Sequence, residues 1–135
     1  MRFVKLSQEE LKDMAKFYKG VMATAYEGLF YREGKSIGRS ILSVVSEGDD
    51  YVEKASKLIK ARGWVEEIEF QEDTAIVIGS VEVDDESDEP TCHRLRGIIS
   101  VIYENKTGSL VEVNESECAS LGNDKCIFDI EIKGY

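Results

Sequence analysis

The residues best suited to chemistry lie in the last third of the chain, in the stretch LVEVNESECASLGNDKCIFDI. Two alternating apolar runs there flank a polar loop that contains Glu115 and Cys118, with Cys126 just beyond it. The chain has one further cysteine, Cys92, which precedes the only histidine, His93. Thiolates and carboxylates are established protein ligands of zinc. We therefore predict that Cys92, Glu115, Cys118 and Cys126 converge on one metal ion.

The spacing alone leaves a second interpretation open. Glu115-x-x-Cys118, followed by seven residues and Cys126, does not match a standard zinc ribbon, and unconnected buried thiols are the usual state of cysteines. A predicted hairpin favours the metal, because its ends would place Glu115 and Cys126 opposite each other. The first turn of a helix that begins near Cys92 would approach from the side. Helix amides and a bound cation would both favour the thiolate form that binds metal.

Composition sets limits on the fold and on the partners. The 135 residues, 42% of them hydrophobic, fit one domain over residues 1–135. A formal charge of -10 would repel a phosphate backbone, so we expect no direct binding of nucleic acid. We see neither a signal peptide nor a run near the roughly 20 apolar residues of a membrane span, and we expect a cytoplasmic protein. An odd number of cysteines argues against a disulfide framework.

Helical periodicity dominates the first 63 residues. Ser7 and Glu10 form a capping-box pattern that starts a long first helix, which we expect to bend or end near Gly28. Apolar residues at helical spacing predict a second, short helix over residues 37–45 and a third over residues 52–59. The apolar faces of these helices are expected to pack against any sheet that follows.

Strand periodicity begins after residue 63. Residues 64–70 alternate, and residues 74–83 are rich in β-branched side chains, so the two runs predict a hairpin. The acidic composition of residues 82–89 predicts a solvated loop. Residues 110–114 and 126–132 predict a second hairpin whose alternation points Cys126 into the core.

A fourth helix connects the two hairpins. Thr91 is a plausible N-cap, which would place Cys92 and His93 on the first turn. The pattern after it is the cleanest amphipathic stripe in the chain, formed by Leu95, Ile98, Ile99, Ile102 and Tyr103.

Aromatic residues supply a candidate ligand pocket between the long first helix and the sheet. The candidates for its lining are Tyr18, Tyr26, Trp64, Phe70 and His93. Ordinary core packing is the alternative for the aromatic residues, and a surface or satisfied position is the alternative for the histidine. The sequence shows no nucleophile–base pair, glycine-rich dinucleotide loop or HExxH motif, so it gives no direct indication of an enzyme.

Cys92 with the helix after it, Glu115-x-x-Cys118, and Gly122-Asn-Asp-Lys-Cys126-Ile-Phe128 together resemble the 4-vinyl reductase (vinyl-4-reductase, 4VR) domain family. The likeness extends upstream over nearly the whole chain. This family includes a protein implicated in bacteriochlorophyll vinyl reduction, stand-alone archaeal proteins and sensory domains of phenol- and xylene-responsive activators. It is distantly similar to TRAPP vesicle-tethering subunits.

The resemblance implies a fold, a metal and a class of ligand. It implies an α/β (α+β) domain of the NO-signalling/Golgi-transport ligand-binding type, with an antiparallel sheet of about four or five strands and four helices. The zinc of the aromatic-sensing members is held by three cysteines and one glutamate, which correspond here to Cys92, Cys118, Cys126 and Glu115. Because four protein ligands leave no open position, the zinc should be structural.

Three functions follow as expectations. The first is a sensor-type domain that binds a small hydrophobic or aromatic molecule and forms a homodimer. The alternatives are a tetrapyrrole vinyl reductase-type enzyme and a non-catalytic assembly subunit. No phenol-contacting polar residue of the sensors has a match in this chain.

Overall fold

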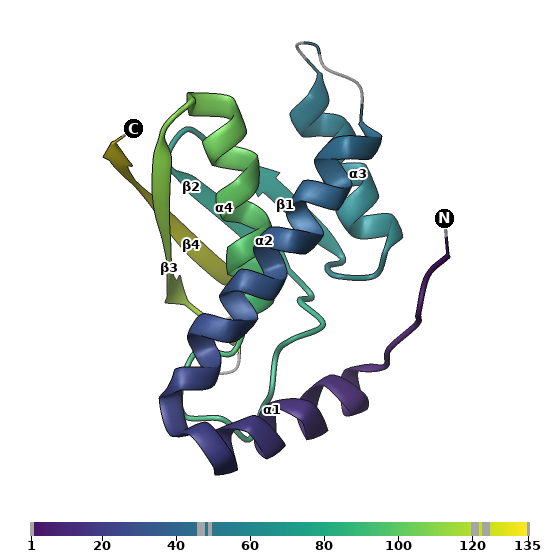
Figure 1. The fold of residues 1–135 in the computed structure, drawn as a ribbon, viewed down its shortest axis with the longest axis vertical. Coiled ribbons are helices and arrows are strands. Elements are labelled where there is room, and N and C mark those ends of the chain that lie inside the picture. The colour runs from purple at the N-terminus through teal and green to yellow at the C-terminus, as the bar shows by residue number, and fades with distance from the viewer. Residues whose placement is uncertain (1, 46–47, 49, 120–121, 123–124, 135) are drawn as a thin grey trace.

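A central helix, α4 (His93–Thr107), lies between a four-stranded sheet and a second helix, α2 (Tyr26–Val44), in the computed structural model of the protein (Figure 1). The structure describes residues 2–45, 48, 50–119, 122 and 125–134. Two further helices, α1 (Gln8–Met22) and α3 (Tyr51–Ala61), lie at the margins. This arrangement confirms the predicted α+β class.

The sheet of the described residues joins two hairpins side by side. Its strands are β1 (Glu67–Phe70), β2 (Thr74–Ile78), β3 (Leu110–Glu117) and β4 (Cys126–Gly134), in the order β1-β2-β4-β3 with every pair antiparallel. Both predicted hairpins are therefore confirmed, and β2 and β4 form the seam between them.

Two strand ends differ from the prediction. β2 ends at Ile78 rather than near residue 83, because Gly79 adopts φ +70° and turns the chain out of the sheet. β3 continues to Glu117, beyond the predicted end at residue 114. Its pairing with β4 carries on past that point, so Glu115 lies on a strand and not in the loop.

The predicted first and second helices are divided differently in the structure. α1 ends at Met22, a 3-10 turn covers Ala23–Ala25, and α2 then runs through Gly28 to Val44. The expectation of a break near Gly28 was wrong, because the break is made by Ala23 with φ 52°. The new direction of the chain buries Tyr26 and Phe30, which periodicity alone could not reveal.

The fourth helix is not amphipathic as predicted, because α4 is buried on nearly every side. Ser100 and Val101, which lie off the predicted stripe, are also buried, and Val101 lies against Gly38 of α2. The two helices meet at Gly34 and Gly97. A Cβ on Gly34 would overlap the carbonyl of Arg94, so this close approach requires glycine.

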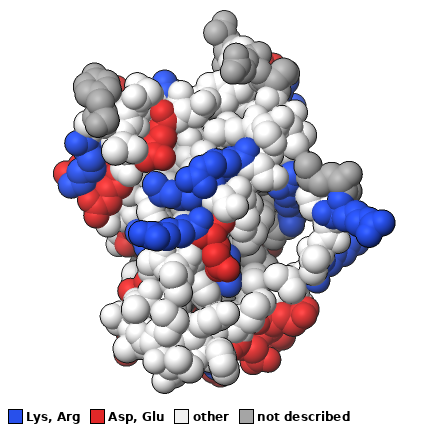
Figure 2. Space-filling model, in the orientation of Figure 1, with Lys and Arg blue, Asp and Glu red and all other residues white. Residues whose placement is uncertain are grey.

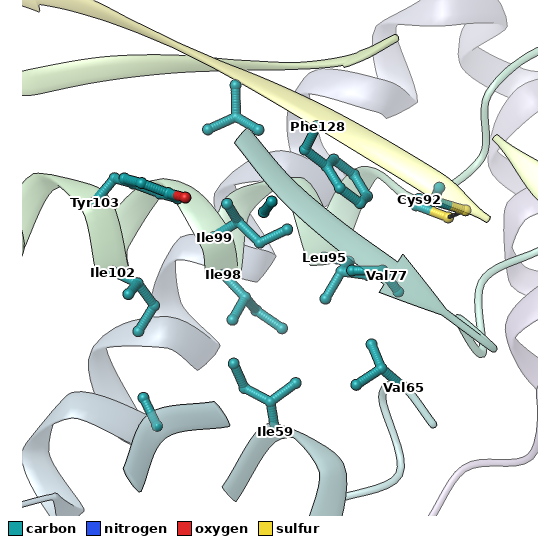
Figure 3. Packing of buried hydrophobic residues seen from close by; sticks show 14 of the residues in the cluster. Ile59, Val65, Val77, Cys92, Leu95, Ile98, Ile99, Ile102, Tyr103 and Phe128 are labelled. Carbon is teal, nitrogen blue, oxygen red and sulfur yellow. Dashed lines mark hydrogen bonds between the residues drawn. The ribbon is translucent and has the colours of Figure 1, made fainter. Parts of the chain in front are cut away.

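The hydrophobic core lies mainly between α4 and the sheet (Figure 3). Tyr103 closes one end of it, where its hydroxyl donates hydrogen bonds to the carbonyls of Gln71 (2.5 Å) and Thr74 (3.0 Å) at the β1–β2 turn. The largest fully buried side chains are Tyr103, Phe128, Ile41, Ile59, Leu95, Ile98, Ile99 and Ile102. Because α4 occupies the layer against the sheet, α1 does not line a space on the sheet.

Candidate metal site and adjoining cavity

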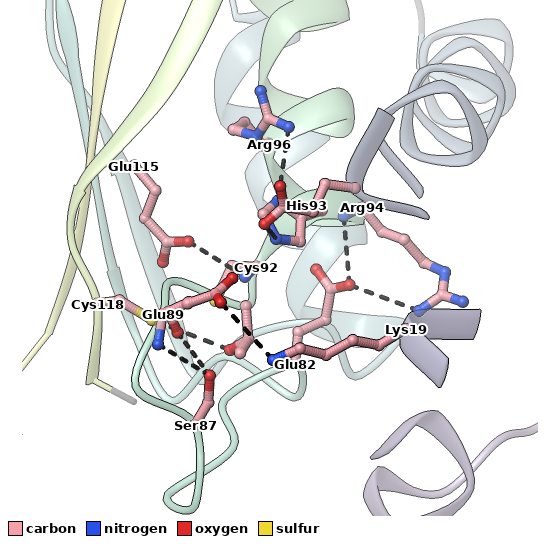
Figure 4. A network of polar contacts seen from close by, with 12 residues as sticks. Lys19, Glu82, Ser87, Glu89, Cys92, His93, Arg94, Arg96, Glu115 and Cys118 are labelled. Carbon is pink, nitrogen blue, oxygen red and sulfur yellow. Dashed lines mark hydrogen bonds and ion pairs between the residues drawn. The ribbon is translucent and has the colours of Figure 1, made fainter. Parts of the chain in front are cut away.

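The four predicted metal ligands lie together at the start of α4. Cys92 is the N-cap residue of α4, Glu115 lies on β3, Cys118 follows β3 directly, and Cys126 is the first residue of β4. One ligand atom from each residue lies within 4.8 Å of the others. The three cysteines are buried. Figure 4 shows Cys92, Glu115 and Cys118 around the beginning of the helix.

The geometry of the cluster fits a tetrahedral ion. The Sγ atoms of Cys92 and Cys126 are 3.8 Å apart, and Zn–S bonds of about 2.3 Å place two sulfurs of a tetrahedron about 3.8 Å apart. Glu115 accepts a hydrogen bond through Oε1 from the backbone amide of Cys92 at 3.1 Å. Its Oε2 is buried and has no hydrogen-bond partner among the described residues, so it is a free acceptor for a cation.

The cluster favours its neutral form when no cation is present. Hydrogen bonding to Cys118 and Cys126, with burial, holds the pKa of Cys92 well above its usual value, and contact with Cys118 likewise raises the pKa of Cys126. Burial, followed by the nearby Cys118, raises the pKa of Glu115. A divalent cation would reverse this balance and stabilise the thiolates. The described residues therefore form a cluster that could hold a metal ion.

A second carboxylate, that of Glu82, caps α4 from another direction. Its oxygens accept hydrogen bonds from the amides of Leu95 (2.8 Å) and Arg94 (3.2 Å), and the Arg94 guanidinium lies 3.6 Å away. Capping is thus done by remote carboxylates, and Thr91 is not the N-cap residue. Burial raises the pKa of Glu82 to about 7.

The expectation of a solvated acidic loop is wrong for Glu82, which is only 8% exposed. The acidic character of residues 82–89 concealed it. One sequence signal could have revealed it, namely its position between Val81 and Val83. Apolar neighbours within an acidic run indicate that the segment packs against the body of the protein.

His93 is buried beside the cluster and is neutral. Burial, with a contribution from Arg96, lowers the pKa of His93 to about 4. Its ring meets the ring of Tyr26 edge to face at 5.9 Å, and Nε2 lies 3.3 Å from Oε1 of Glu27. His93 therefore belongs to the wall between α2 and α4.

The five predicted pocket residues do not gather around one space. A first group, Tyr18, Tyr26 and His93, forms a chain of edge-to-face contacts with Phe30 near the start of α4. Phe70 contacts Tyr103 at the other end of the core. Trp64 is partly buried against the core, and its backbone carbonyl accepts a hydrogen bond from the amide of Val81 at 2.9 Å.

A cavity of about 210 Å³ lies beneath α1, close to the first group. It is bounded by α1, the start of α2, the segment after β2 and the first turn of α4. Its lining includes Leu11, Ala15, Tyr26, Phe30, Val81 and Arg94. The wall carries charge as well as apolar surface, since lysines of α1 and carboxylates of the acidic segment face each other across it.

None of the helices in the described part of the chain is long and apolar enough to cross a membrane. The exposed surface is strongly charged, and Figure 2 shows bands of basic side chains across the middle of one face.

No curated protein matches the chain. The phenol-responsive sensory domain of the transcription activator PoxR, solved with phenol, is similar in structure with a TM-score of 0.72 at 17% identity, over 98% of this chain and 77% of that one. A vinyl-4-reductase family protein from Methanocaldococcus jannaschii matches with a TM-score of 0.63 at 19% identity, over 98% of both chains.

These likenesses confirm the predicted fold. The sequence of residues 75–132 matches the V4R domain. That segment runs from β2 to β4 and contains all four residues of the cluster, although Asn123 and Asp124 of the predicted motif lie outside the described residues. The match of residues 75–132 to the V4R domain therefore agrees with the family resemblance that the sequence indicated.

Proposed function

We propose that this protein is a small-molecule-binding domain of the sensor type, held together by one structural zinc ion. One observation carries the proposal: 98% of the chain shares the fold of a domain that responds to phenol. The cavity beneath α1 supplies a place for such a ligand.

The size of the cavity limits the ligand. Cavities of about 150 Å³ are known to hold benzene, so a cavity of about 210 Å³ suits one aromatic ring or an apolar molecule of similar size. Tyr26 and Phe30 supply an aromatic wall, which Tyr18 and His93 support from outside. Trp64 and Phe70 are not among the residues that line this cavity, so the proposal rests on the first group.

Zinc is the metal that the donor set favours. Three thiolates and one carboxylate are soft and borderline ligands, which select zinc over magnesium or calcium. Cys92, Glu115, Cys118 and Cys126 would fill all four positions, so the ion ties the β3–β4 hairpin to α4 and does not act on a substrate. We also propose a cytoplasmic location, because an odd number of cysteines argues against a disulfide framework and suits a reducing compartment.

A thermal-shift screen tests ligand binding. Phenols, tetrapyrroles and lipids are screened against wild-type protein, against Ala15→Leu, which fills the cavity, and against Asp13→Leu on the exposed side of α1. We expect a single-ring compound to raise the Tm of wild type and Asp13→Leu but not that of Ala15→Leu. A screen in which no compound raises the Tm of the wild type would contradict the ligand proposal.

A second candidate, an assembly subunit or homodimer, is favoured by the apolar corner where α1 meets α2. Phe17 is 67%, Val21 70% and Leu29 44% exposed there. Figure 2 shows few charged side chains at the lower left of the view and an acidic patch at the lower right. Exposed apolar surface of this kind is typical of protein interfaces. Light scattering should give a dimer for wild type and a monomer for Val21→Asp, and a monomeric wild type at high concentration would count against it.

A further inference from the structure

The junction of α1 and α2 holds one residue in a strained conformation. Ala23 has φ 52° and ψ -128°, and it is the only non-glycine residue with positive φ in the described ranges. A side chain disfavours this region of backbone space, and such strain persists only when surrounding contacts impose it. The contacts that bend the chain here are those that hold α1 against the body of the protein.

The sequence through the bend is a helical sequence. The segment Met22-Ala23-Thr24-Ala25 contains neither glycine nor proline, and apolar residues keep helical spacing from Leu11 to Leu29. This is why periodicity predicts a single helix where the structure has two. A continuous helix would return Ala23 to the ordinary αR region and relieve its strain.

The contacts that hold α1 down are few. Leu11 is the only residue of α1 that is fully buried. Gln8 donates a hydrogen bond through Nε2 to the carbonyl of Val83 at 3.1 Å. Tyr18 meets Phe30 of α2 edge to face at 5.8 Å. The remaining attachments are two exposed ion pairs, Lys16 with Glu86 at 3.6 Å and Lys19 with Glu89 at 3.7 Å (Figure 4 labels Lys19 and Glu89). Exposed pairs of this kind are weak and are screened by salt.

The same helix forms one wall of the cavity. Leu11, Ala15 and Lys19 face it from α1, and the acidic segment faces it from the opposite side. The cavity is already partly open to solvent, and movement of α1 away from residues 82–89 would widen its opening.

We propose that α1 is a hinged cover for this cavity. When Ala23 relaxes into the αR region, α1, the 3-10 turn and α2 join into one helix over residues 8–44. The contacts to the acidic segment then break, and the opening of the cavity widens for ligand entry. The inference rests on the proposed ligand site for its purpose. The hinge itself requires no ligand.

NMR on isotope-labelled protein without ligand tests the hinge. Relaxation-dispersion and saturation-transfer experiments detect minor states that exchange on the microsecond to millisecond timescale and beyond. We expect a minor state in which Ala23 has helical Cα and Cβ shifts. Glycine at position 23 accepts the bent conformation without strain and weakens the continuous helix. Ala23→Gly should therefore lower the minor population about tenfold.

Ala25→Gly is the matched control, because Ala25 already has αR angles and its replacement relieves no strain. The fraction of Ala25→Gly protein in the minor state should therefore not fall as it does for Ala23→Gly. The paired change Lys16→Gln and Lys19→Gln, or added salt, should raise the minor population, whereas Lys57→Gln on α3 should not.

Three results would overturn the hinge: wild-type protein with no minor state, a minor state in which Ala23 is not helical, and a minor population that grows with protein concentration. The last would indicate exchange of α1 between copies. These spectra need no ligand, so the two proposals can fail separately. A rigid α1 would refute the hinge but not the ligand proposal, and a thermal-shift screen without a hit would refute the ligand proposal but not the hinge.

Discussion

Glu115 on β3 accepts a hydrogen bond from the backbone amide of Cys92 at 3.1 Å, and its other carboxylate oxygen is buried without a partner among the described residues. One oxygen therefore caps α4 while the other is directed to the thiols of the cluster. This single side chain links the sheet, the start of the helix and the candidate metal site.

Replacing Glu115 with glutamine should separate these two roles. The amide oxygen of the new side chain can still accept from Cys92, but the side chain has no negative charge for the metal. We expect the affinity for zinc to fall by more than about tenfold in Glu115→Gln, measured by competition with a chromophoric chelator. Glu117→Gln, an exposed change on the same strand, is the control. Equal zinc affinity in the two variants would remove Glu115 from the ligand set.

The buried carboxyl of Glu82 should make stability depend on pH. Burial raises its pKa in the folded protein from 4.5 to about 7, so the folded state holds this proton more tightly than the unfolded state does. The stabilisation is fully present below about pH 4.5 and is lost as the pH rises through about 7. The contribution is on the order of 3 kcal/mol.

Urea unfolding of wild type and Glu82→Gln between pH 4.5 and 8 measures this contribution. We expect the free energy of unfolding of the wild type to fall across that window relative to the variant, which cannot ionise. The difference isolates Glu82 from the other titrating groups. Parallel curves for the two proteins would show that Glu82 has an ordinary pKa.

The contact of α2 with α4 depends on two glycines. A Cβ on Gly34 would overlap the Arg94 carbonyl, and a Cβ on Gly97 would overlap the Tyr31 carbonyl. Each of Gly34→Ala and Gly97→Ala should therefore cost about 2 to 4 kcal/mol of unfolding free energy. Gly20→Ala places its Cβ in open space and should stabilise the protein by up to about 1 kcal/mol. Chemical denaturation compares the three, and equal stabilities would refute the close crossing.

Tyr103 should contribute through its hydroxyl as well as its ring. The hydroxyl donates to the carbonyls of Gln71 and Thr74, and without it both carbonyls would lack this donor. Tyr103→Phe should lower the free energy of unfolding by about 1 kcal/mol. Tyr18→Phe on the exposed aromatic side is the control, and a Tyr103→Phe protein as stable as this control would contradict the role.

The ligand cluster and both hairpins could be predicted because their signals are local. Alternation places Cys126 on the core face, and hairpin pairing then fixes the neighbours of Glu115. The break at Ala23 could not be predicted, because tertiary contacts impose a conformation that its own sequence disfavours. Glu82 was hidden for the same kind of reason: its burial depends on the amides of Arg94 and Leu95, which follow it by more than ten residues.

The metal content of the purified protein tests the account most directly. Elemental analysis together with native mass spectrometry should find about one zinc per chain in wild-type protein, and its removal by a chelator should lower the Tm and release the β3–β4 hairpin from α4. Cys118→Ser should bind zinc more weakly. Protein that is purified without metal, takes up no zinc and keeps its full thermal stability would contradict the proposal that Cys92, Glu115, Cys118 and Cys126 form a structural zinc site.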